Sequence, residues 1–243
     1  MNKSALPDVA ILAGGLGSRL QPVIGDLPKT LAPIGGKPFI EFVLQQVGVF
    51  GFGRVVLCCG YRAERIRNLL GNAYGDLQLS YSIEDRPLGT AGALRAGLHL
   101  INTDTMVVLN GDSFCALDFE RLIRFHRFKE ADLTLTLTKL VETARFGSAT
   151  IADDGRVRSF DDSGQGSGPG WINAGVYTMQ KSWLERLPEN EFISLEADVL
   201  RSRTDLNLFG YRSFESAGRF IDIGTPKSYE EADRFFSEAS QST

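Results

Sequence analysis

Short apolar runs alternate with segments of helical apolar spacing along the first half of the chain. The run VAILAG (9–14) ends in glycine and predicts a strand buried on both faces. Residues 37–50 instead space their apolar side chains as a helix does, with Pro38 in the first turn. The same alternation continues to about residue 128. It predicts a parallel sheet covered by helices on both faces.

The remaining predicted elements of this half share the same two patterns. The strands are RVVLCCG (54–60), LQLSYSIED (77–85) and TMVVLNGDS (105–113), and the helices are AERIRNLL (63–70), TAGALRAGLHL (90–100) and DFERLIRFHRF (118–128). Ligands of parallel sheets bind beyond the carboxyl ends of the strands. We therefore expect the chemistry in the loops that begin at Ala13, Gly60, Glu84 and Gly111.

The second half of the chain has a different pattern. Leu and Thr alternate in ADLTLTLTKL (131–140), which predicts a strand with two different faces and so a mixed sheet. Residues 161–170 are rich in Gly and Ser and predict a mobile loop. A strand (207–214), the segment RFIDIGTP (219–226) and a helix (227–236) follow. Because no repeat or linker interrupts the pattern, we expect one α/β domain over residues 1–243.

Composition narrows the possible functions. The formal net charge of −4 and the pI near 5.3 argue against a nucleic-acid-binding surface, which needs a concentrated basic face. No apolar run is long enough to span a bilayer, and the start MNKSALPD lacks the apolar segment of a signal peptide. We therefore expect a cytoplasmic protein without nucleic-acid or membrane partners.

Cysteine and histidine offer no metal site. Cys58 and Cys59 lie inside an apolar run and are interpreted as buried strand residues, and Cys115 has no partner at metal-ligand spacing. His99 and His126 lie on separate predicted helices, so neither is expected to take part in the chemistry.

The stretch LAGGLGSRLQPVIGDLPKTLAPIGGKP (12–38) concentrates glycine, proline and basic residues. It does not match the dinucleotide fingerprint GxGxxG, because Leu20 stands where the third glycine belongs. It does not match the P-loop GxxxxGK[ST] either, because Pro28 precedes Lys29. Neither common phosphate motif explains the stretch.

Glycine lets backbone N–H groups approach an anion closely, so a triphosphate fits this loop. Arg19 can hold phosphate oxygens in a bidentate manner, and Lys29 follows Pro28 with a compact positive charge. The alternative from spacing alone is a tight turn with two solvated basic residues.

Two aspartates follow predicted strands and add a possible metal site. Asp112 comes after MVVLNG and Asp222 after FI. Either aspartate alone would more often be a turn or capping residue. Together with a phosphate loop they suggest Mg²⁺, which is typically held by one or two carboxylates and substrate phosphates.

The pattern L-A-G-G-x-G-[ST]-R-L-x-P, then P-K, then P-x-x-G-K-P, closely resembles the signature of the sugar-1-phosphate nucleotidyltransferases, or NDP-sugar pyrophosphorylases. Further segments fall in the family's order: PLGTAGAL (87–94), NGDS (110–113), RFG (145–147), NAGVY (173–177) and FIDIGTP (220–226). The resemblance covers almost the whole chain. It implies a Rossmann-like, three-layer α/β/α fold with a mixed, mostly parallel sheet, a nucleotide-binding part over about 1–130 and a sugar-phosphate-binding part over about 131–243.

The implied reaction is in-line attack by a sugar 1-phosphate oxygen on the α-phosphorus of an NTP, which releases pyrophosphate. By resemblance, Asp112 and Asp222 hold the Mg²⁺ cofactor, Arg19 stabilises the leaving pyrophosphate and Lys29 brings the two phosphates together. Catalytic roles are thus implied for Arg19, Lys29 and Asp112. The implied nucleotide-binding residues are Leu12, Ala13, Gly14, Gly15, Gly17, Ser18, Gly89 and Thr90. The implied sugar-side residues are Gly147, Asn173 and Gly175.

Thr90 is expected at a helix start, where it could also serve as a helix cap. Many family members carry an F-x-E-K segment whose lysine contacts the sugar phosphate, but the corresponding place here contains Asp161 and Asp162. Arg158, Arg219 or the backbone of the glycine-rich loop could substitute for that lysine.

Within the family, the chain looks most like the D-glycero-α-D-manno-heptose-1-phosphate guanylyltransferases of bacterial surface-polysaccharide pathways. The features that carry this likeness are the short form of the chain and the segments PLGTAGAL and INAGVY. The expected substrates are then GTP and that heptose 1-phosphate, in a protein that could form a homo-oligomer. Acetyl transfer is not expected, because the chain stops soon after FIDIGTP. Alternatives are a hexose-1-phosphate uridylyl- or thymidylyltransferase, a mannose guanylyltransferase, or a catalytically silent nucleotide-binding regulator. Glycosyl transfer is disfavoured, since Asn-Gly-Asp stands in place of Asp-x-Asp.

Overall fold

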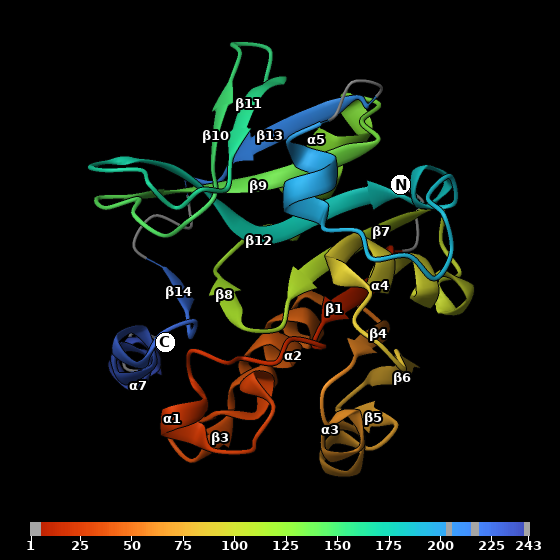
Figure 1. Cartoon of the computed structure of the whole chain (residues 1–243). Coiled ribbons are helices and arrows are strands. Elements are labelled where there is room, and N and C mark those ends of the chain that lie inside the picture. Colours follow the sequence, from red (N-terminus) through yellow and green to blue (C-terminus); the bar gives the residue numbers. More distant parts are fainter. Residues whose placement is uncertain (1–5, 203–205, 215–218, 241–243) are drawn as a thin grey trace.

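The computed structural model describes residues 6–202, 206–214 and 219–240 (Figure 1). The start MNKSALPD therefore lies partly outside the described residues. Among the described helices, none combines the length and the apolar character that a membrane span requires.

The elements up to residue 128 are β1 (Asp8–Leu12), α1 (Gln21–Ile24), η1 (Lys29–Leu31), β2 (Pro33–Ile34), β3 (Lys37–Pro38), α2 (Phe39–Phe50), β4 (Arg54–Cys59), α3 (Ala63–Leu70), β5 (Ala73–Tyr74), β6 (Leu77–Ile83), α4 (Gly89–Gly97), η2 (Leu98–Leu100), β7 (Thr105–Asn110), β8 (Ser113–Cys115) and α5 (Phe119–Phe128). The following elements are β9 (Leu133–Leu140), β10 (Ser148–Ile151), β11 (Val157–Asp161), β12 (Gly170–Gln180), α6 (Lys181–Leu184), η3 (Leu195–Leu200), β13 (Leu208–Arg212), β14 (Phe220–Asp222) and α7 (Pro226–Ser240). The predicted alternation of strands and helices up to residue 128 is confirmed.

A ten-stranded mixed sheet forms the middle of the molecule. Its main path runs β11-β10-β12-β7-β1-β4-β6-β5, and β9 pairs with β12 and with β13. The four neighbours β7, β1, β4 and β6 are parallel, whereas β12 runs antiparallel to β7. The carboxyl ends of β1, β4, β6 and β7 therefore meet at one edge, and the loops expected to carry the chemistry begin there.

Two apolar cores cover the two faces of this sheet. Val9 and Ile11 of β1 belong to the core that includes α2, α3 and α7 residues, whereas Ala10 belongs to the core that includes α4, α6 and η3 residues. Successive side chains of a strand point to opposite faces, so a strand covered on both sides is apolar throughout. This arrangement confirms the three-layer α/β/α architecture.

The strand β9 confirms the expectation of two different faces in a mixed sheet. Its alternating Leu and Thr residues do face opposite sides, but both faces are buried, and Thr134, Thr136 and Thr138 have no solvent exposure. The threonine face is covered because α5 packs against β9, β12 and β13. Nδ1 of His126, a buried residue of α5, lies 2.9 Å from Oγ1 of Thr134.

Several element boundaries differ from the predictions. The helix expected over residues 37–50 begins at Phe39, because Pro38 pairs in β3 and then precedes the helix as its N-cap residue. The strand expected to reach Ser113 ends at Asn110, and the next residues turn into the separate short strand β8. The loop expected over residues 161–170 is present between β11 and β12; its mobility stays a prediction.

The C-terminal segment returns to the N-terminal part of the molecule, where Figure 1 shows β14 and α7 close to α1 and β3. The strand β14 pairs antiparallel with β8, which places Asp222 opposite Ser113. Phe236 of α7 stacks on Phe42 of α2 with ring centroids 3.9 Å apart. Segments from both ends of the chain therefore build one region around the end of β7.

Candidate functional site

The glycine-rich loop after β1 brings its backbone against Lys29. Gly17 has a φ of +61°, which L side chains rarely adopt, and a Cβ at this position would lie 2.9 Å from Cβ of Lys29. Pro28 precedes the single turn of η1 that begins at Lys29. The lysine stem thus packs on a loop backbone that has room for it only because residue 17 is glycine.

Lys29 ends in an ion pair with Asp112. Its Nζ atom lies 2.6 Å from Oδ2 of Asp112, with the two side chains 12% and 38% exposed. Gly111 donates a backbone hydrogen bond of 2.9 Å to the carbonyl of Leu12, and a Cβ on Gly111 would lie 2.8 Å from that oxygen. The carboxylate of Asp112 is therefore fixed beside the end of β1 by a close approach of two backbones.

The second carboxylate, that of Asp222, is tied to the first through the backbone. The N–H of Ile223 donates a hydrogen bond of 3.0 Å to the carbonyl of Asp112, and the N–H of Gly224 donates one of 2.7 Å to Oδ1 of Asp222. The guanidinium of Arg145 donates to both oxygens of Asp222, at 3.2 and 2.7 Å. Each aspartate thus has its own cationic partner.

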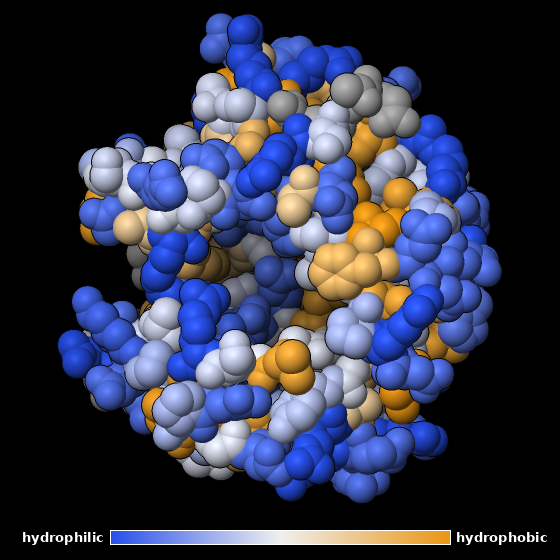
Figure 2. All heavy atoms as spheres, in the orientation of Figure 1, coloured by the Kyte–Doolittle hydropathy of each residue, from blue (hydrophilic) through white to orange (hydrophobic). Residues whose placement is uncertain are grey.

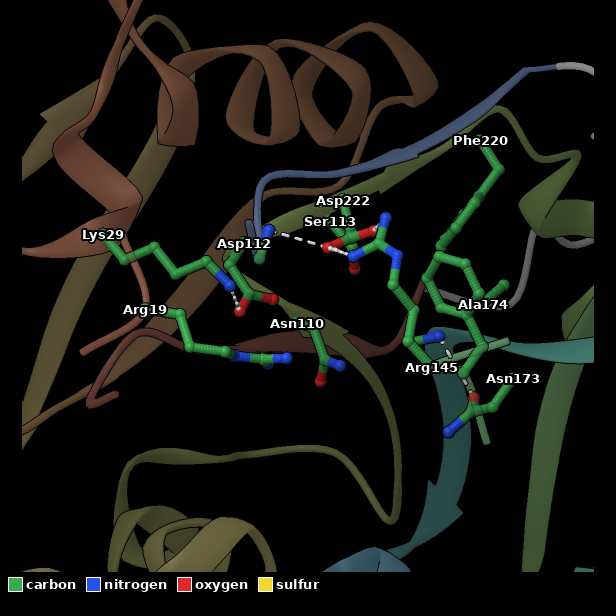
Figure 3. A pocket seen from close by; sticks show the side chains of 13 residues that line it. Arg19, Lys29, Asn110, Asp112, Ser113, Arg145, Asn173, Ala174, Phe220 and Asp222 are labelled. Atoms are coloured by element: carbon green, nitrogen blue, oxygen red, sulfur yellow. Dashed lines mark hydrogen bonds and ion pairs between the residues drawn. The ribbon is translucent and has the colours of Figure 1, made fainter. Parts of the chain in front are cut away.

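These groups surround a cavity of about 140 Å³. In Figure 3, Arg19 and Lys29 enter from one side and Arg145 from the other, with the two aspartates between them. The other lining residues are Asn110, Ser113, Phe146, Asn173, Ala174, Gly175, Phe220 and Gly224. Figure 2 shows that this face of the molecule is hollowed and that much of the hollow is hydrophilic. The oxygen Oδ1 of Asn110 is buried and finds no hydrogen-bond partner among the described residues, which is uncommon for a buried polar atom.

The two aspartates suit a magnesium ion. Their carboxylate oxygens are hard ligands, and the backbone hydrogen bond from Ile223 to Asp112 holds the two segments together. The negative charge of each carboxylate, which a bound ion would neutralise, is neutralised here by Lys29 or Arg145. No group of three His, Cys, Asp or Glu side chains at metal-binding distance occurs in the part of the chain that the structure describes. The chemistry of this donor set therefore fits an ion that completes its shell with substrate phosphates and water.

A third carboxylate lies at the neighbouring strand ends. Oε1 of Glu84 is so close to Gly14 and Gly60 that a Cβ at either position would lie 3.1 or 2.5 Å from it. Oε2 of Glu84 accepts a hydrogen bond of 3.2 Å from the N–H of Leu88. Burial raises the pKa of Glu84, and the Leu88 hydrogen bond partly opposes this rise. The loop after β1 and the loop after β6 thus meet around one half-buried acid.

The start of α4 joins this edge of the sheet to η3. Gly89 has a φ of +73°, and a Cβ there would lie 2.5 Å from the carbonyl oxygen of Ile193. The hydroxyl of Thr90 donates to Oε2 of Glu196 at 2.8 Å and accepts from the N–H of Leu195 at 2.7 Å. Leu88 is the N-cap residue, so the expectation that Thr90 caps α4 is wrong; its hydroxyl is drawn to η3 instead.

The same glutamate, Glu196, is also hydrogen-bonded toward Asn173, one of the residues predicted to bind the sugar. Tyr177 donates to Oε1 of Glu196 at 3.2 Å, and Nδ2 of Asn173 donates to the Tyr177 hydroxyl at 2.6 Å. Oδ1 of Asn173 accepts from the N–H of Gly175, where the φ is +69°. A chain of four side chains, Thr90, Glu196, Tyr177 and Asn173, therefore connects the predicted nucleotide residues with the predicted sugar residues.

The structure brings most of the predicted site residues to one face. Arg19, Lys29, Asp112, Asp222, Asn173 and Gly175 line the cavity together. Gly147 lies just behind it, where its carbonyl accepts a hydrogen bond of 2.7 Å from the N–H of Asn173 and a Cβ would meet the ring of Phe160 at 2.8 Å. Eight other predicted site residues do not line this cavity: Leu12, which ends β1; Ala13, Gly14, Gly15, Gly17 and Ser18, which lie in the segment after β1; and Gly89 and Thr90, which begin α4.

Three residues of interest were missed by the sequence reasoning. Arg145 lies in the motif RFG, but its spacing from Asp222 gives no sign of their contact. Glu84 begins one of the four expected loops and could have been found from its place directly after a strand. Glu196 carries no sequence signal, because its role depends on packing of η3 against α4. Arg158 and Arg219, considered as phosphate ligands, are not among the described residues that line the cavity.

The fold and this site together define a nucleotide-transferring enzyme. Residues 9–239 match the family model described as "Nucleotidyl transferase", and the chain belongs to this family. The chain is 37% identical over 227 residues to the D-glycero-alpha-D-manno-heptose 1-phosphate guanylyltransferase of Aneurinibacillus thermoaerophilus, covering 93% of this chain and 97% of that protein.

Two further similarities extend the comparison. The crystal structure of HddC from Yersinia pseudotuberculosis complexed with GMP-PN has a TM-score of 0.84 and 33% identity, over 95% of this chain and 100% of the other. The mannose-1-phosphate guanylyltransferase of Mycobacterium tuberculosis is 30% identical over 91% of this chain, which spans 62% of that protein. These findings confirm the resemblance to the sugar-1-phosphate nucleotidyltransferases.

Proposed function

We propose that this protein joins GTP to D-glycero-α-D-manno-heptose 1-phosphate, forming the GDP-sugar and pyrophosphate. The observation that carries the proposal is the cavity in which three cations and two aspartates meet at the carboxyl end of the parallel strands. Both substrates are polyanions, so such a site supplies the charges that they need. The similarity to a heptose 1-phosphate guanylyltransferase along nearly its whole length supports the choice of sugar.

The reaction requires positioning and charge neutralisation more than acid or base catalysis. A phosphate oxygen of the sugar 1-phosphate is already ionised near neutral pH, and it attacks the α-phosphorus of GTP. A new P–O bond forms, the bond between the α-phosphorus and the bridging oxygen to the β-phosphate breaks, and pyrophosphate leaves with that electron pair. Holding the two phosphates in line lowers the entropic part of the barrier.

The cationic side chains have distinct tasks in this proposal. Arg19 follows the glycine-rich loop and faces the cavity, where its guanidinium can hold two oxygens of the leaving pyrophosphate. Lys29 is shielded, at 12% exposure, so its charge acts in a medium less polarisable than bulk water. Its ammonium group lies next to Asp112 and can reach phosphate oxygens between the two substrates.

Asp112 and Asp222 would hold a Mg²⁺ ion, which when bound neutralises phosphate charge and makes the α-phosphorus more electrophilic. The backbone hydrogen bond between Ile223 and Asp112 keeps the two acids together before any ligand arrives. Gly224 donates to Asp222 and so fixes the direction of its carboxylate. The protein thus prepares the oxygen ligands on rigid backbone.

The base preference for guanine is supported by Glu84. Guanine presents two neighbouring N–H groups, at N1 and N2, and an ionised carboxylate accepts hydrogen bonds only. Glu84 stands where the loops after β1 and β6 meet, beside the backbone of Gly14 and Gly60. A nucleotide whose phosphates lie along the glycine-rich loop would bring its base to this edge. Uracil and thymine present a single ring N–H between two carbonyl groups and match a carboxylate less well.

The direct test measures pyrophosphate release with Mg²⁺ for each of four NTPs against the 1-phosphates of the heptose, mannose and glucose. We expect the highest kcat/KM for GTP with the heptose 1-phosphate, and loss of activity in the Asp112→Asn variant. Preference for another pair would correct the substrates and keep the reaction class. Silence with every pair, combined with intact GTP binding, would refute the proposal in favour of a regulatory homologue.

The proposal also places the reaction in the cytoplasm, where nucleoside triphosphates are available. Supply of GDP-heptose to surface-polysaccharide synthesis is the corresponding proposed role.

A further inference from the structure

Arg145 is held in an unusual backbone conformation at the edge of the cavity. Its φ is +75°, in the left-handed region that residues other than glycine rarely adopt. Its N–H donates a hydrogen bond of 2.9 Å to the carbonyl of Gly164, and its guanidinium carbon lies 4.5 Å from the centroid of the Phe146 ring. The loop between β9 and β10 is thus shaped so that this guanidinium enters the cavity.

The partner of Arg145 is one of the two carboxylates that suit a metal ion. Arg145 binds Asp222 through two parallel hydrogen bonds, and the Asp222 side chain is 14% exposed. The arrangement repeats that of Lys29 on Asp112. Each of the two acids therefore faces a cation whose charge it neutralises.

Both partners of this ion pair have better ligands once substrates are present. A carboxylate is a hard oxygen ligand for Mg²⁺, and a guanidinium matches a phosphate with the same two-point geometry that it uses on a carboxylate. Asp222 keeps its hydrogen bond from Gly224 when Arg145 leaves, so its oxygens stay in place. When substrates bind, two contacts can therefore replace the ion pair between Arg145 and Asp222: Asp222 with the metal ion, and Arg145 with a phosphate.

The walls of the cavity indicate which phosphate Arg145 meets. Arg19 and Lys29 come from the segment after β1, on the nucleotide side. Arg145 comes from the opposite wall, which it shares with Asn173 and Phe220, as Figure 3 shows. A second phosphate that enters between these walls lies next to Arg145.

We propose that Arg145 binds the phosphate of the sugar 1-phosphate, and that its ion pair with Asp222 is the resting state that the incoming substrate and its metal replace. This inference rests on the proposed function. The segment at Asp161 and Asp162 offers no cation for this task, because Asp162 is itself ion-paired with Arg201. Arg145 is the cation that the described part of this wall brings into the cavity.

The test compares wild type with Arg145→Ala, Arg145→Lys and the control Arg158→Ala, whose arginine is exposed and outside the cavity lining. Steady-state kinetics with GTP and the heptose 1-phosphate, and with mannose 1-phosphate, give both KM values. Calorimetry measures binding of each sugar phosphate in the presence of Mg²⁺ without turnover. Thermal unfolding of each variant reports a merely structural role.

For Arg145→Ala we expect the KM for the sugar 1-phosphate to rise at least tenfold and its calorimetric affinity to fall by a similar factor. The KM for GTP should change less than twofold, and Arg145→Lys should recover part of the affinity because it keeps the charge. Arg158→Ala should behave as wild type.

Unchanged sugar phosphate binding in Arg145→Ala would overturn the inference, as would an equal rise of both KM values together with a lowered Tm. A different result would refute the proposed function: the wild-type protein would transfer no nucleotide to any sugar 1-phosphate. In that case the calorimetry still decides whether Arg145 binds sugar phosphate.

Discussion

Nζ of Lys29 lies 2.6 Å from Oδ2 of Asp112, although 83 residues separate them in the chain. The contact joins the first residue of η1, which follows Pro28, to the two-residue connection between β7 and β8. Because Asp112 is 38% exposed, water can solvate it when the lysine is removed, so the pair contributes little to folding. Because both residues line the cavity, we expect the pair to matter for catalysis rather than for stability.

Replacement of Lys29 by alanine should therefore lower kcat by about 10²- to 10³-fold, as expected for a lost charge that faces the reacting phosphates. The Tm should stay close to that of wild type. Pyrophosphate release measures the first effect and thermal unfolding the second. The exposed Lys37 supplies a matched control, and Lys37→Ala should retain full activity. Equal loss in both lysine variants would contradict the assignment.

Asp112→Asn should weaken binding of a divalent ion without unfolding the protein, because the amide keeps the size of the side chain but loses its charge. Mn²⁺ binding followed by electron paramagnetic resonance, in the presence of GTP, should show at least a tenfold loss of affinity. Chelation of the metal should abolish pyrophosphate release by wild type. Unaltered Mn²⁺ affinity in the variant would show that the metal is held elsewhere.

Gly89→Ala and Gly15→Ala form a pair that separates folding from function. Alanine at residue 89 would be strained by the φ of +73° and by the carbonyl of Ile193, so the free energy of unfolding should fall by about 2 kcal/mol or more. Apart from its two chain neighbours, no described residue has an atom within 4 Å of a Cβ at residue 15, and stability there should change by less than about 0.5 kcal/mol.

The expected effect of Gly15→Ala is instead a loss of activity, because the added methyl group would occupy the space in which we expect phosphate to approach the backbone. Urea denaturation and pyrophosphate release measured on the same preparations distinguish the two quantities. Full activity in Gly15→Ala would argue against phosphate binding at this residue.

Glu84→Gln should weaken the preference for GTP. Glutamine offers one acceptor and two donors, so it no longer presents two acceptors to the N1 and N2 groups of guanine. We expect kcat/KM for GTP to fall about 10- to 100-fold while that for UTP changes less. The ratio of the two kcat/KM values is the measurement, and a constant ratio would remove Glu84 from base recognition.

His126 should make stability depend on pH. Burial, followed by the positive charge of Arg127, lowers its pKa from 6.5 to about 4, while Asp132 acts in the opposite direction. Between these values the unfolded chain binds the proton and the folded protein does not. The contribution of His126 is therefore present above pH 6.5 and is lost as the pH falls toward 4.

The expected loss from this group between about pH 7.5 and pH 5 is on the order of 2 kcal/mol. Urea denaturation at both pH values measures it. A His126→Gln variant should show a smaller fall in the free energy of unfolding over the same range, because its side chain does not titrate. An equal fall in both proteins would assign the pH dependence to other groups.

The local pattern of apolar and polar residues was sufficient to predict many helices and strands of this fold. The helix over residues 63–70 and the strands that begin at Arg54 and Thr105 were predicted within a few residues, because each combines a clear apolar period with glycine at its end. The short strand β8 was missed, since three residues carry no period. Its existence depends on pairing with β14, which follows more than a hundred residues later.

The residues of the candidate site also divide into those that local sequence reveals and those that only long-range packing brings together. The glycine-rich loop, Arg19, Lys29 and the two aspartates could be found because each carries a local signal of its own, a motif or a position directly after a strand. The partners could not be found. Arg145 reaches Asp222, and Thr90 and Tyr177 share Glu196, only because β9, β12, β14 and η3 come together around β7.

The sequence by itself therefore determined the class of fold, the position of the glycine-rich loop and four of the charged residues that line the cavity, because periodicity and motifs are properties of neighbouring residues. The tertiary structure alone decided which charges face one another, that both faces of β9 are buried, and that Arg145 stands opposite Lys29 across one cavity. Such pairings join residues far apart in the chain, and they form only when the packing of the sheet and its helices brings them together.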